Sequence, residues 1–526
     1  MISHTHPLGH APVGGSVHRR WSDALWAHPA TRIAAAAGAA ITSGLAAALI
    51  MPRGPVTSVQ ALILMALGLL TGIAAGFAMR SRWASLIAPV THIAAFEIAR
   101  VGEDGPTVDG IHLGTTYGIL ALILGRGVYI VLAIMPMLVG VAWGKGFASR
   151  IAADPLVRVN RRHRLRHRIG VGANALTTVA IIVLAAWIAR PASVPPVVDA
   201  SGNEIPGSIA EITRITLGGN EQWIQVRAAN PDNPVIVYIP GGPGQSDFAQ
   251  SRVLLQPLED NFVVVTWDQA GNGRSYASWD PARITPERAV ADLIELTDYL
   301  RDRFDEEKIY LLGESWGTAP AVLAAQQRPD LFHAIISSGQ MVAFTETDRM
   351  IYEDLLAWAD ANDQGLAEQL RDSGPPPYDD LWAYSVLFEN YPNIESDYDP
   401  PQAYVDRHEA SGVGFFGVMG SEYDPINKVN LFRGLMDTFD VLYPQLQGID
   451  FRRDVPSLDV PIYIFDGEHE LRGRREPLQE WFGMLQAPEK QMFTYEDGGH
   501  AVAFEHADDL DRILNEIILP ATYPEG

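Results

Sequence analysis

Long apolar runs fill most of the first third of the chain, separated by short polar loops. Three of these runs are long and apolar enough to cross a bilayer as helices, namely 30–51, 56–79 and 171–189. A fourth run, 115–143, is long for one span but too short for two, and a weaker run, 83–101, suits either a span or an interfacial helix. This pattern predicts an all-α transmembrane region over residues 29–190, preceded by an N-terminal tail of residues 1–28.

The fourth apolar run is interrupted by Gly125, Arg126 and Gly127. A charged side chain is costly inside a bilayer, and small residues permit sharp bends in helices. The interruption therefore predicts a kink or a buried polar contact at this point of the run.

Charge separates the chain into a basic first part and an acidic remainder. Residues 1–190 carry 17 Lys and Arg against 6 Asp and Glu, whereas the remaining residues carry 22 against 57. Six arginines between Arg158 and Arg168 precede the last apolar run, and the positive-inside rule places their loop in the cytoplasm. Arginines near the N-terminus place that end inside as well. An odd number of crossings, five, then puts everything after Arg190 outside the cytoplasm.

Beyond a Pro-rich linker over residues 191–207, short β-rich runs alternate with helical patterns such as 286–304. Strands are expected at 223–228, 234–239, 262–267, 309–312, 334–337, 462–465 and 492–495. This alternation predicts an α/β domain with a mostly parallel sheet. Its core is assigned to residues 208–340 and 448–526, and residues 341–447 break the alternation and predict a helical lid.

The sequence Gly313-Glu314-Ser315-Trp316-Gly317 follows one of these strands and precedes an Ala-rich helical pattern over residues 318–327. A Gly-x-Ser-x-Gly between a strand and a helix is typical of a nucleophile elbow, in which a strained turn exposes the serine. Developing negative charge is favoured at the N-terminus of the following helix. Ser315 is therefore the candidate nucleophile, and the alternative is a serine that only caps the helix.

A glycine-rich turn over residues 240–244, with the sequence Pro-Gly-Gly-Pro-Gly, follows an earlier strand. Paired glycines let backbone N–H groups face a substrate oxygen, and the residue after the nucleophile supplies a second N–H. We predict an oxyanion hole formed by Gly242 and Trp316, with Gly241 as an alternative donor. A plain Gly/Pro turn is the other interpretation.

Three motifs resemble those of the proline iminopeptidase-like group of α/β-hydrolases. Residues 240–244 are similar to its His-Gly-Gly-Pro-Gly signature, residues 267–275 to its Asp-Gln-Arg-Gly-x-Gly-x-Ser stretch, and Gly339-Gln340 fits many relatives. The resemblance covers residues 212–518 and implies an α/β-hydrolase fold, with helices on both faces of the sheet and a helical lid. Pro240 replaces the usual His and Ala270 the usual Arg, which weakens a transfer of prolyl specificity more than a transfer of the chemistry.

Hydrolases of this class order the triad Ser, acid, His along the chain. His500 follows the last expected strand and two glycines, and histidine suits a general base because it titrates near neutral pH. The resemblance implies an acid at the end of a Gly-x-x-Asp, and Glu470 stands there in residues 467–470. Asp466, directly after the strand, is the rival acid, or else a turn-forming side chain.

The sequence excludes several classes of site. The chain has no Cys, so disulfides, thiolate metal sites and a Cys nucleophile are excluded. It has no metal-binding motif, P-loop or dinucleotide fingerprint, so we expect neither a metal nor another cofactor. Nucleic acid is not an expected partner, because the acidic domain would repel phosphates. Acidic lid residues can bind the free α-amine of a peptide, and the candidates are Glu346, Glu353 and Asp354.

These patterns predict a multi-pass protein of the cell membrane, whose partners are the lipid bilayer and a small peptide or ester substrate. Ser315, His500 and Glu470 would act as a triad through an acyl-enzyme. The resemblance implies an aminopeptidase of proline iminopeptidase type that acts on short peptides outside the cytoplasm. A carboxylic-ester hydrolase or lipase is the first alternative, and a catalytically inactive, ligand-binding membrane receptor is the second.

Overall fold

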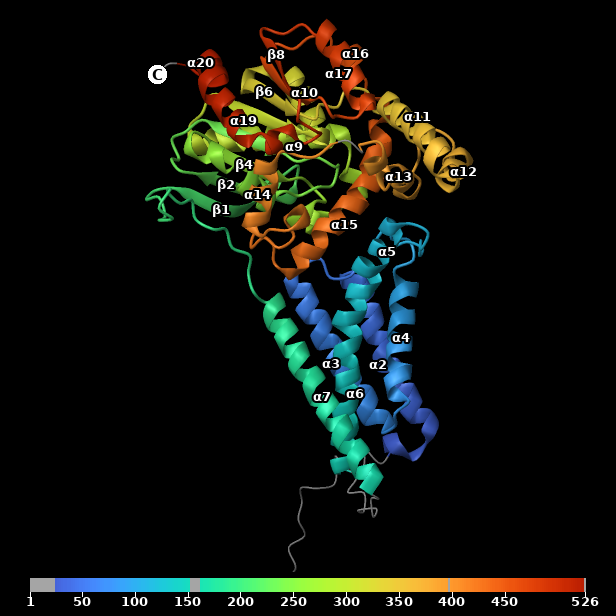
Figure 1. Cartoon of the computed structure of the whole chain (residues 1–526). Helices are drawn as coiled ribbons and strands as arrows, with labels where there is room; N and C mark the ends of the chain where they lie inside the picture. The colour runs from blue at the N-terminus through green and yellow to red at the C-terminus, as the bar shows by residue number, and fades with distance from the viewer. Residues whose placement is uncertain (1–23, 152–160, 396–397, 525–526) are drawn as a thin grey trace, which may run out of the picture. The chain divides into compact units, whose positions relative to one another are not determined.

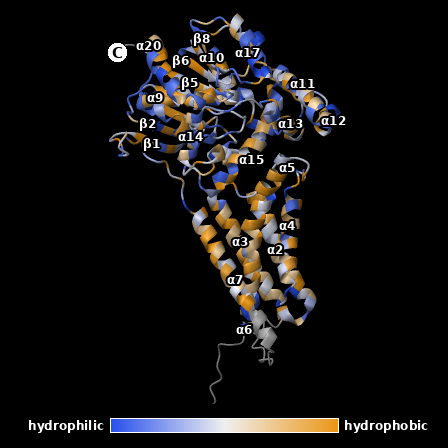
Figure 2. Cartoon of the chain, viewed as in Figure 1, coloured by the Kyte–Doolittle hydropathy of each residue, from blue (hydrophilic) through white to orange (hydrophobic). Residues whose placement is uncertain are grey.

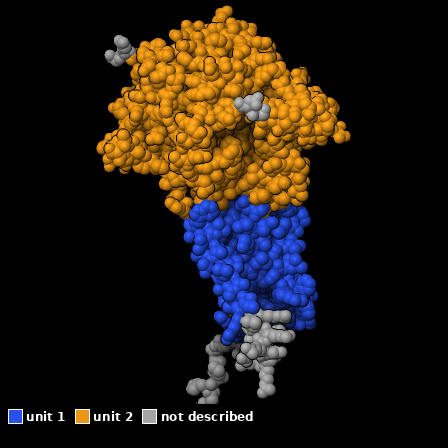
Figure 3. All heavy atoms as spheres, in the orientation of Figure 1, with its two compact units in different colours: residues 1–103, 127–189 blue, residues 104–126, 190–526 orange. Residues whose placement is uncertain are grey.

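The structure is a computed structural model, which describes residues 24–151, 161–395 and 398–524. Its internal contacts divide the chain into two compact units (Figure 1; Figure 3). Unit 1 comprises Met1–Glu103 and Gly127–Ala189, and unit 2 comprises Asp104–Arg126 and Arg190–Gly526. Most of the predicted N-terminal tail, residues 1–23, and Arg158 of the predicted cytoplasmic loop lie outside the described residues.

The described residues of unit 1 are largely helical and strongly apolar (Figure 2). Among the described residues of the chain, four helical runs are long and apolar enough to cross a membrane: Pro29–Ile50 (α2), Ser58–Met79 (α3), Thr116–Ile151, and Arg168–Ile188 within α7. Helix α7 begins at Arg161, well before the predicted span. The weaker run forms α4, Ala84–Ala99, which is apolar but has only 16 residues.

The run Thr116–Ile151 changes its helical geometry along its length. It consists of α5 (Thr116–Leu122), two π-helical segments (Ile123–Gly127 and Ile130–Ile134) and α6 (Met135–Ile151). Arg126 lies in the first π-helical segment and donates to the backbone oxygens of Asp109 (2.8 Å) and Val108 (3.1 Å). The predicted interruption is therefore a local widening of the helix together with a polar contact.

Glycines on α3 permit a close approach between helices of unit 1. A Cβ on Gly68, Gly72 or Gly76 would lie 2.2 Å or less from a backbone oxygen of residues 133–141. Small residues at every fourth position are typical of membrane helices that pack backbone against backbone.

An eight-stranded sheet forms the centre of unit 2, in the order β1-β2-β4-β3-β5-β6-β7-β8. The strands are β1 (Ile209–Leu217), β2 (Asn220–Ala228), β3 (Val235–Ile239), β4 (Val263–Asp268), β5 (Ile309–Glu314), β6 (Phe332–Ser338), β7 (Ile462–Gly467) and β8 (Lys490–Tyr495). Strand β2 pairs antiparallel with β1 and β4, and the other neighbours are parallel. The mostly parallel sheet is confirmed, while the half-exposed edge strand β1 is additional to the expected strands.

Two apolar cores cover the two faces of this sheet. Along β3, Val235, Val237 and Ile239 belong to one core and Ile236 and Tyr238 to the other, because successive side chains of a strand point to opposite faces. The first core includes residues of α9 (Pro286–Phe304), α10 (Thr318–Gln327) and α17 (Arg472–Met484), and the second includes residues of α8 (Phe248–Leu254) and α19 (Ala507–Ile513). Helices thus cover both faces, as predicted.

The predicted lid lies between β6 and β7 in the chain and is helical. Its described helices are α11 (Phe344–Asn362), α12 (Gln364–Ser373), α13 (Leu381–Phe388), α14 (Gln402–Ser411) and α15 (Pro425–Leu442). Three shorter helices lie in the predicted core segment 448–526 of the α/β domain: α16 (Phe451–Asp454), α18 (Val502–Glu505) and α20 (Leu519–Thr522).

Two segments belong to unit 2 although their sequence predicts other roles. The first is Asp104–Arg126, which falls inside the predicted transmembrane region. The second is the predicted linker, which contacts the α/β domain instead of extending away from it: Arg227 donates to the oxygen of Pro195 (2.6 Å), and the N–H of Ser193 to the oxygen of Ser421 (2.8 Å).

Candidate active site

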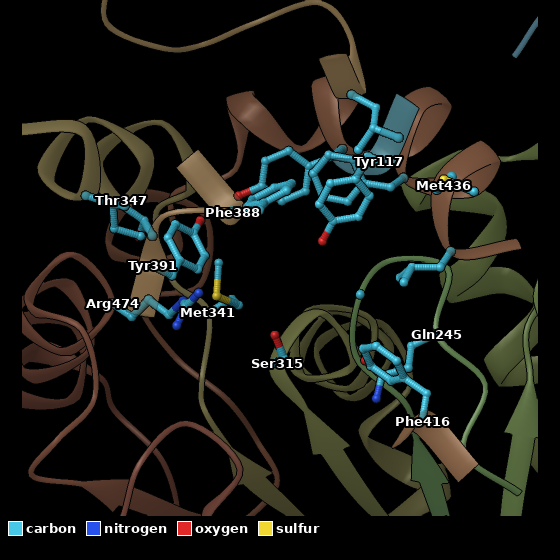
Figure 4. A pocket seen from close by; sticks show the side chains of 16 residues that line it. Tyr117, Gln245, Ser315, Met341, Thr347, Phe388, Tyr391, Phe416, Met436 and Arg474 are labelled. Atoms are coloured by element: carbon cyan, nitrogen blue, oxygen red, sulfur yellow. The ribbon is translucent and has the colours of Figure 1, made fainter. Parts of the chain in front are cut away.

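Ser315 occupies a tight turn between β5 and α10, as a nucleophile elbow requires. Its φ of 52° is a left-handed conformation that is strained for any residue other than glycine. A Cβ on Gly317 would lie 2.0 Å from the carbonyl oxygen of Ile239, so glycine at this position lets the turn approach β3. The turn presents Ser315 to a pocket (Figure 4).

The glycine-rich turn after β3 passes directly beside Ser315. A Cβ on Gly241 would lie 3.0 Å from the Cβ of Ser315, and Gly242, with a φ of 109°, lines the same pocket as Ser315. Trp316 follows the serine in the elbow. The predicted oxyanion donors therefore belong to two segments that meet at Ser315.

Gln269 connects these two segments. The indole Nε1 of Trp316 donates to Oε1 of Gln269 (3.2 Å), and Nε2 of Gln269 donates to the backbone oxygen of Pro240 (3.4 Å). A side-chain amide suits this position because it supplies one acceptor and one donor. The sequence identified this glutamine only as part of a family motif, and the structure shows that it braces the predicted oxyanion hole.

The sheet order brings the three predicted triad residues to one edge. Strands β5, β6, β7 and β8 are parallel neighbours, so their carboxyl ends lie at the same edge of the sheet. Ser315 follows β5, Glu470 follows β7 and His500 follows β8.

Glu470 and His500 are in direct contact. A carboxylate oxygen of Glu470 contacts Nδ1 of His500, and its other oxygen accepts from Nη1 of Arg474 (2.9 Å) and from the N–H of Leu471 (2.7 Å). Burial alone would raise the pKa of Glu470, but His500 and Arg474 outweigh it and lower the pKa to about 2. Glu470 is therefore ionised at neutral pH and suited to orient an imidazole.

Asp466, the rival acid, has a different partner. It lies at the end of β7, and its carboxylate accepts from Nε of Arg475 (3.1 Å). Burial raises the pKa of this carboxyl, and the positive charge of Arg475 acts in the opposite direction. Within the described residues, the carboxylate placed against His500 is that of Glu470.

Close contacts of glycines position the loop that carries His500. A Cβ on Gly339 would lie 2.7 Å from Cε1 of His500, and a Cβ on Gly467 would lie 2.3 Å from the oxygens of Gly498 and Gly499. Only glycine fits at these crossings, so the loop can lie against the ends of β6 and β7. Gly339 belongs to the Gly-Gln pair that the family resemblance includes. The lack of space for a Cβ beside His500 explains why this position is a glycine.

The sequence did not predict the buried acids Asp247 and Glu314, which lie close to the elbow of Ser315. The hydroxyl of Tyr238 lies 2.9 Å from Oδ2 of Asp247 and 3.4 Å from Oε2 of Glu314. Burial raises the pKa of Glu314 to about 7 and that of Asp247 to about 6. Glu314 occupies a variable position of the Gly-x-Ser-x-Gly motif, so the motif gave no signal for it.

The pocket in front of Ser315 is mainly apolar and aromatic, with a volume of about 340 Å³ (Figure 4). Its charged lining residue, Arg474, is paired with Glu470. The apolar lining residues include Met341, Phe388, Tyr391, Phe416, Met436 and Phe439. Such a lining suits an uncharged, apolar part of a substrate.

The three predicted amine-binding acids lie away from this lining. Glu346 pairs with Arg452, and both Glu346 and Glu353 line a separate hollow of about 490 Å³. Asp354 pairs with Arg472 at 2.8 Å. The structure therefore does not bring these carboxylates together with Ser315 in one pocket. Across the described residues, no group of three or more His, Asp or Glu side chains is placed to hold a metal ion.

Comparisons with known proteins agree with this architecture. Residues 234–373 match the sequence model of a family described as the alpha/beta hydrolase fold. The probable aminopeptidase YbaC of Bacillus subtilis is 28% identical over 302 residues, which cover 57% of this chain and 93% of that protein. A proline iminopeptidase of Arabidopsis thaliana is 22% identical over 279 residues, covering 47% of this chain and 71% of the plant protein.

A crystal structure of a proline iminopeptidase-related protein from Thermus thermophilus covers 60% of this chain and 99% of its own, with 20% identity and a TM-score of 0.39. The predicted fold class is confirmed: the second part of the chain has the α/β-hydrolase fold, preceded by a helical region with apolar candidate spans. The fold and the aminopeptidase-named relatives support a hydrolase.

Proposed function

We propose that this chain is a serine hydrolase that works through a covalent acyl-enzyme. Ser315 attacks a carbonyl carbon, and His500 accepts its proton and later returns a proton to the leaving group. Glu470 orients His500 and stabilises the imidazolium form. Backbone N–H groups of Gly242 and Trp316 hold the oxyanion, and water then releases the acyl group.

The observation that carries this proposal is the strained Ser315 in the lining of an apolar pocket, at the sheet edge where Glu470 contacts His500. A serine that only capped a helix would need neither the left-handed turn nor a buried carboxylate held ionised beside a histidine.

The first candidate substrate is the N-terminal residue of a short peptide, because two relatives are named a probable aminopeptidase and a proline iminopeptidase. The second candidate is an uncharged carboxylic ester, which the apolar lining of the pocket favours. Both reactions proceed through the same acyl-enzyme, so the choice between them lies in the pocket and not in the triad.

Side-by-side hydrolysis tests both candidates. The full chain in detergent is assayed with prolyl-naphthylamide and with p-nitrophenyl esters, against Ser315→Ala as the matched blank. We expect turnover of at least one class that disappears in the variant. Turnover that persists in Ser315→Ala contradicts the mechanism. No turnover of either class, together with no labelling by a fluorophosphonate, supports the ligand-binding receptor instead.

We also propose that the chain is a multi-pass membrane protein with its hydrolase domain outside the cytoplasm. The run of arginines before the last apolar helix supports a cytoplasmic loop there. Five crossings require α4 to span, and its 16 residues give about 24 Å of helix, somewhat short of a bilayer core of about 30 Å.

Reporter fusions test this topology. Alkaline phosphatase fused after residue 526 should be active and a cytoplasm-only fluorescent protein dark there, with the opposite result near residue 155. A cytoplasmic signal at residue 526 contradicts both the five-span count and access to external substrates.

A further inference from the structure

The segment Asp104–Arg126 belongs to the α/β-hydrolase unit although apolar helices of unit 1 flank it in the chain. Buried charged residues of α15 hold it in place. The N–H and hydroxyl of Thr107 donate to the two carboxylate oxygens of Asp437 (3.0 and 2.7 Å), and Arg433 donates to the backbone oxygen of Leu124 (2.7 Å). Both α15 side chains are fully buried, so these are charge-assisted contacts shielded from water.

Helix α13 and the residue that follows it hold the same segment from a second side. The N–H of Tyr117 donates to Oε1 of Glu389 (3.2 Å), and the ring of His112 stacks on Trp382 with centroids 4.4 Å apart. Ala121 and Leu124 are part of the apolar core of the hydrolase unit. The segment is therefore an integral part of the hydrolase unit.

One side chain of this segment reaches the pocket of Ser315. Tyr117 is a lining residue, and Figure 4 shows it across the pocket from Ser315, near Phe388 and Met436. Its neighbours in the lining come from the lid helices α13 and α15. The far wall of the pocket is thus shared between the lid and the segment Asp104–Arg126.

We propose that Tyr117 is a specificity-determining residue that sets how long an uncharged, apolar acyl group the pocket accepts. The inference rests on the proposed hydrolase function and names the substrate class of that site. The chemistry occurs at Ser315, and Tyr117 closes the opposite end of the volume that the acyl group fills. A smaller side chain at position 117 lengthens this volume, and a larger one shortens it.

The test is a chain-length series of p-nitrophenyl esters, from acetyl to dodecanoyl, with the full chain in detergent. In the wild type, kcat/KM rises by about fourfold for each methylene that the pocket buries and then falls when the pocket is full. Tyr117→Ala should move the maximum to a longer acyl chain and raise kcat/KM for the first rejected ester by roughly 16-fold, the value of about two extra methylenes. The gain is measured relative to the acetyl ester of the same variant, because so short a group does not reach the far wall.

Two further variants make the result specific. Tyr117→Trp should move the maximum to a shorter chain, which no general loosening of the fold would produce. Leu113→Ala removes a side chain that is 63% exposed in the same segment and should leave the profile unchanged.

Labelling by a small fluorophosphonate separates the possible failures. If wild type and variants label equally but Tyr117→Ala and Tyr117→Trp keep the wild-type profile, the role of Tyr117 is overturned. If the wild type neither labels nor hydrolyses any ester or naphthylamide, the proposed hydrolase function fails instead. If Tyr117→Ala does not accumulate, Tyr117→Trp carries the test, and its unchanged profile overturns the inference.

Discussion

Replacing Glu470 by Gln removes the negative charge next to His500 and keeps a side chain of nearly the same shape. The pKa of Glu470 falls from its ordinary 4.5 to about 2 in the structure. This difference corresponds to roughly 3 kcal/mol of net stabilisation of the carboxylate, by which the attraction of His500 and Arg474 exceeds the cost of burial. If about half of it acts on the imidazolium that forms during the reaction, its loss slows turnover at least tenfold. Amide substitution of a triad acid has cost up to roughly 10⁴-fold.

The assay is kcat for whichever substrate the wild type turns over, measured with matched controls in the same region. Asp466→Asn alters the rival acid, and Glu468→Gln alters a half-exposed carboxylate of the same loop. Both should keep kcat within about threefold of the wild type, because neither carboxylate contacts His500. Melting temperatures in detergent check that Glu470→Gln, which leaves Arg474 without this partner, still folds. A variant Glu470→Gln with wild-type kcat, or a larger loss in Asp466→Asn, refutes the assignment of the acid.

Two other predictions concern the packing of the elbow and the buried carboxyl group of Glu314. Gly317→Ala places a methyl group 2.0 Å from the oxygen of Ile239 and should lower the melting temperature and the yield of folded protein, whereas Gly483→Ala, with open space around its Cβ, should change neither. The pKa of Glu314 is raised from 4.5 to about 7, so unfolding releases a proton and the free energy of unfolding falls as pH rises through this window. Glu314→Gln should reduce this fall in the free energy of unfolding by up to about 3 kcal/mol. Melting curves recorded from about pH 5 to about pH 8 measure it. The same dependence of stability on pH in the variant and the wild type contradicts the shifted pKa.

Local sequence patterns predicted the parts of the site that depend on backbone geometry. The elbow around Ser315 requires glycines and a strand-to-helix turn, and α10 has the predicted bounds. The family resemblance implied the position of Glu470, three residues after Gly467, and the structure places its carboxylate against His500. These features are readable because a few neighbouring residues determine them. Their chemical roles stay predictions.

Contacts between distant residues were not predictable in the same way. The interruption of the apolar run 115–143 at Gly125-Arg126-Gly127 predicts a kink or a polar contact but no domain boundary, so the sequence did not separate Tyr117 from the apolar helix that follows. Its place in the pocket depends on α13 and α15, including contacts of Thr107 and Leu124 with residues more than 300 positions away. The buried position of Glu314 likewise depends on Tyr238 and Asp247, which come from other parts of the chain.

The most direct test of the central claim is to locate the covalent adduct of a fluorophosphonate on the full chain by mass spectrometry. The account predicts one adduct, on Ser315, in the wild-type protein, and no adduct in Ser315→Ala at an unchanged melting temperature. It also predicts slow labelling in Glu470→Gln, because the carboxylate that orients His500 and stabilises its imidazolium form is then absent. An adduct on another residue, or labelling that persists in Ser315→Ala, would contradict the assignment of Ser315 as the nucleophile.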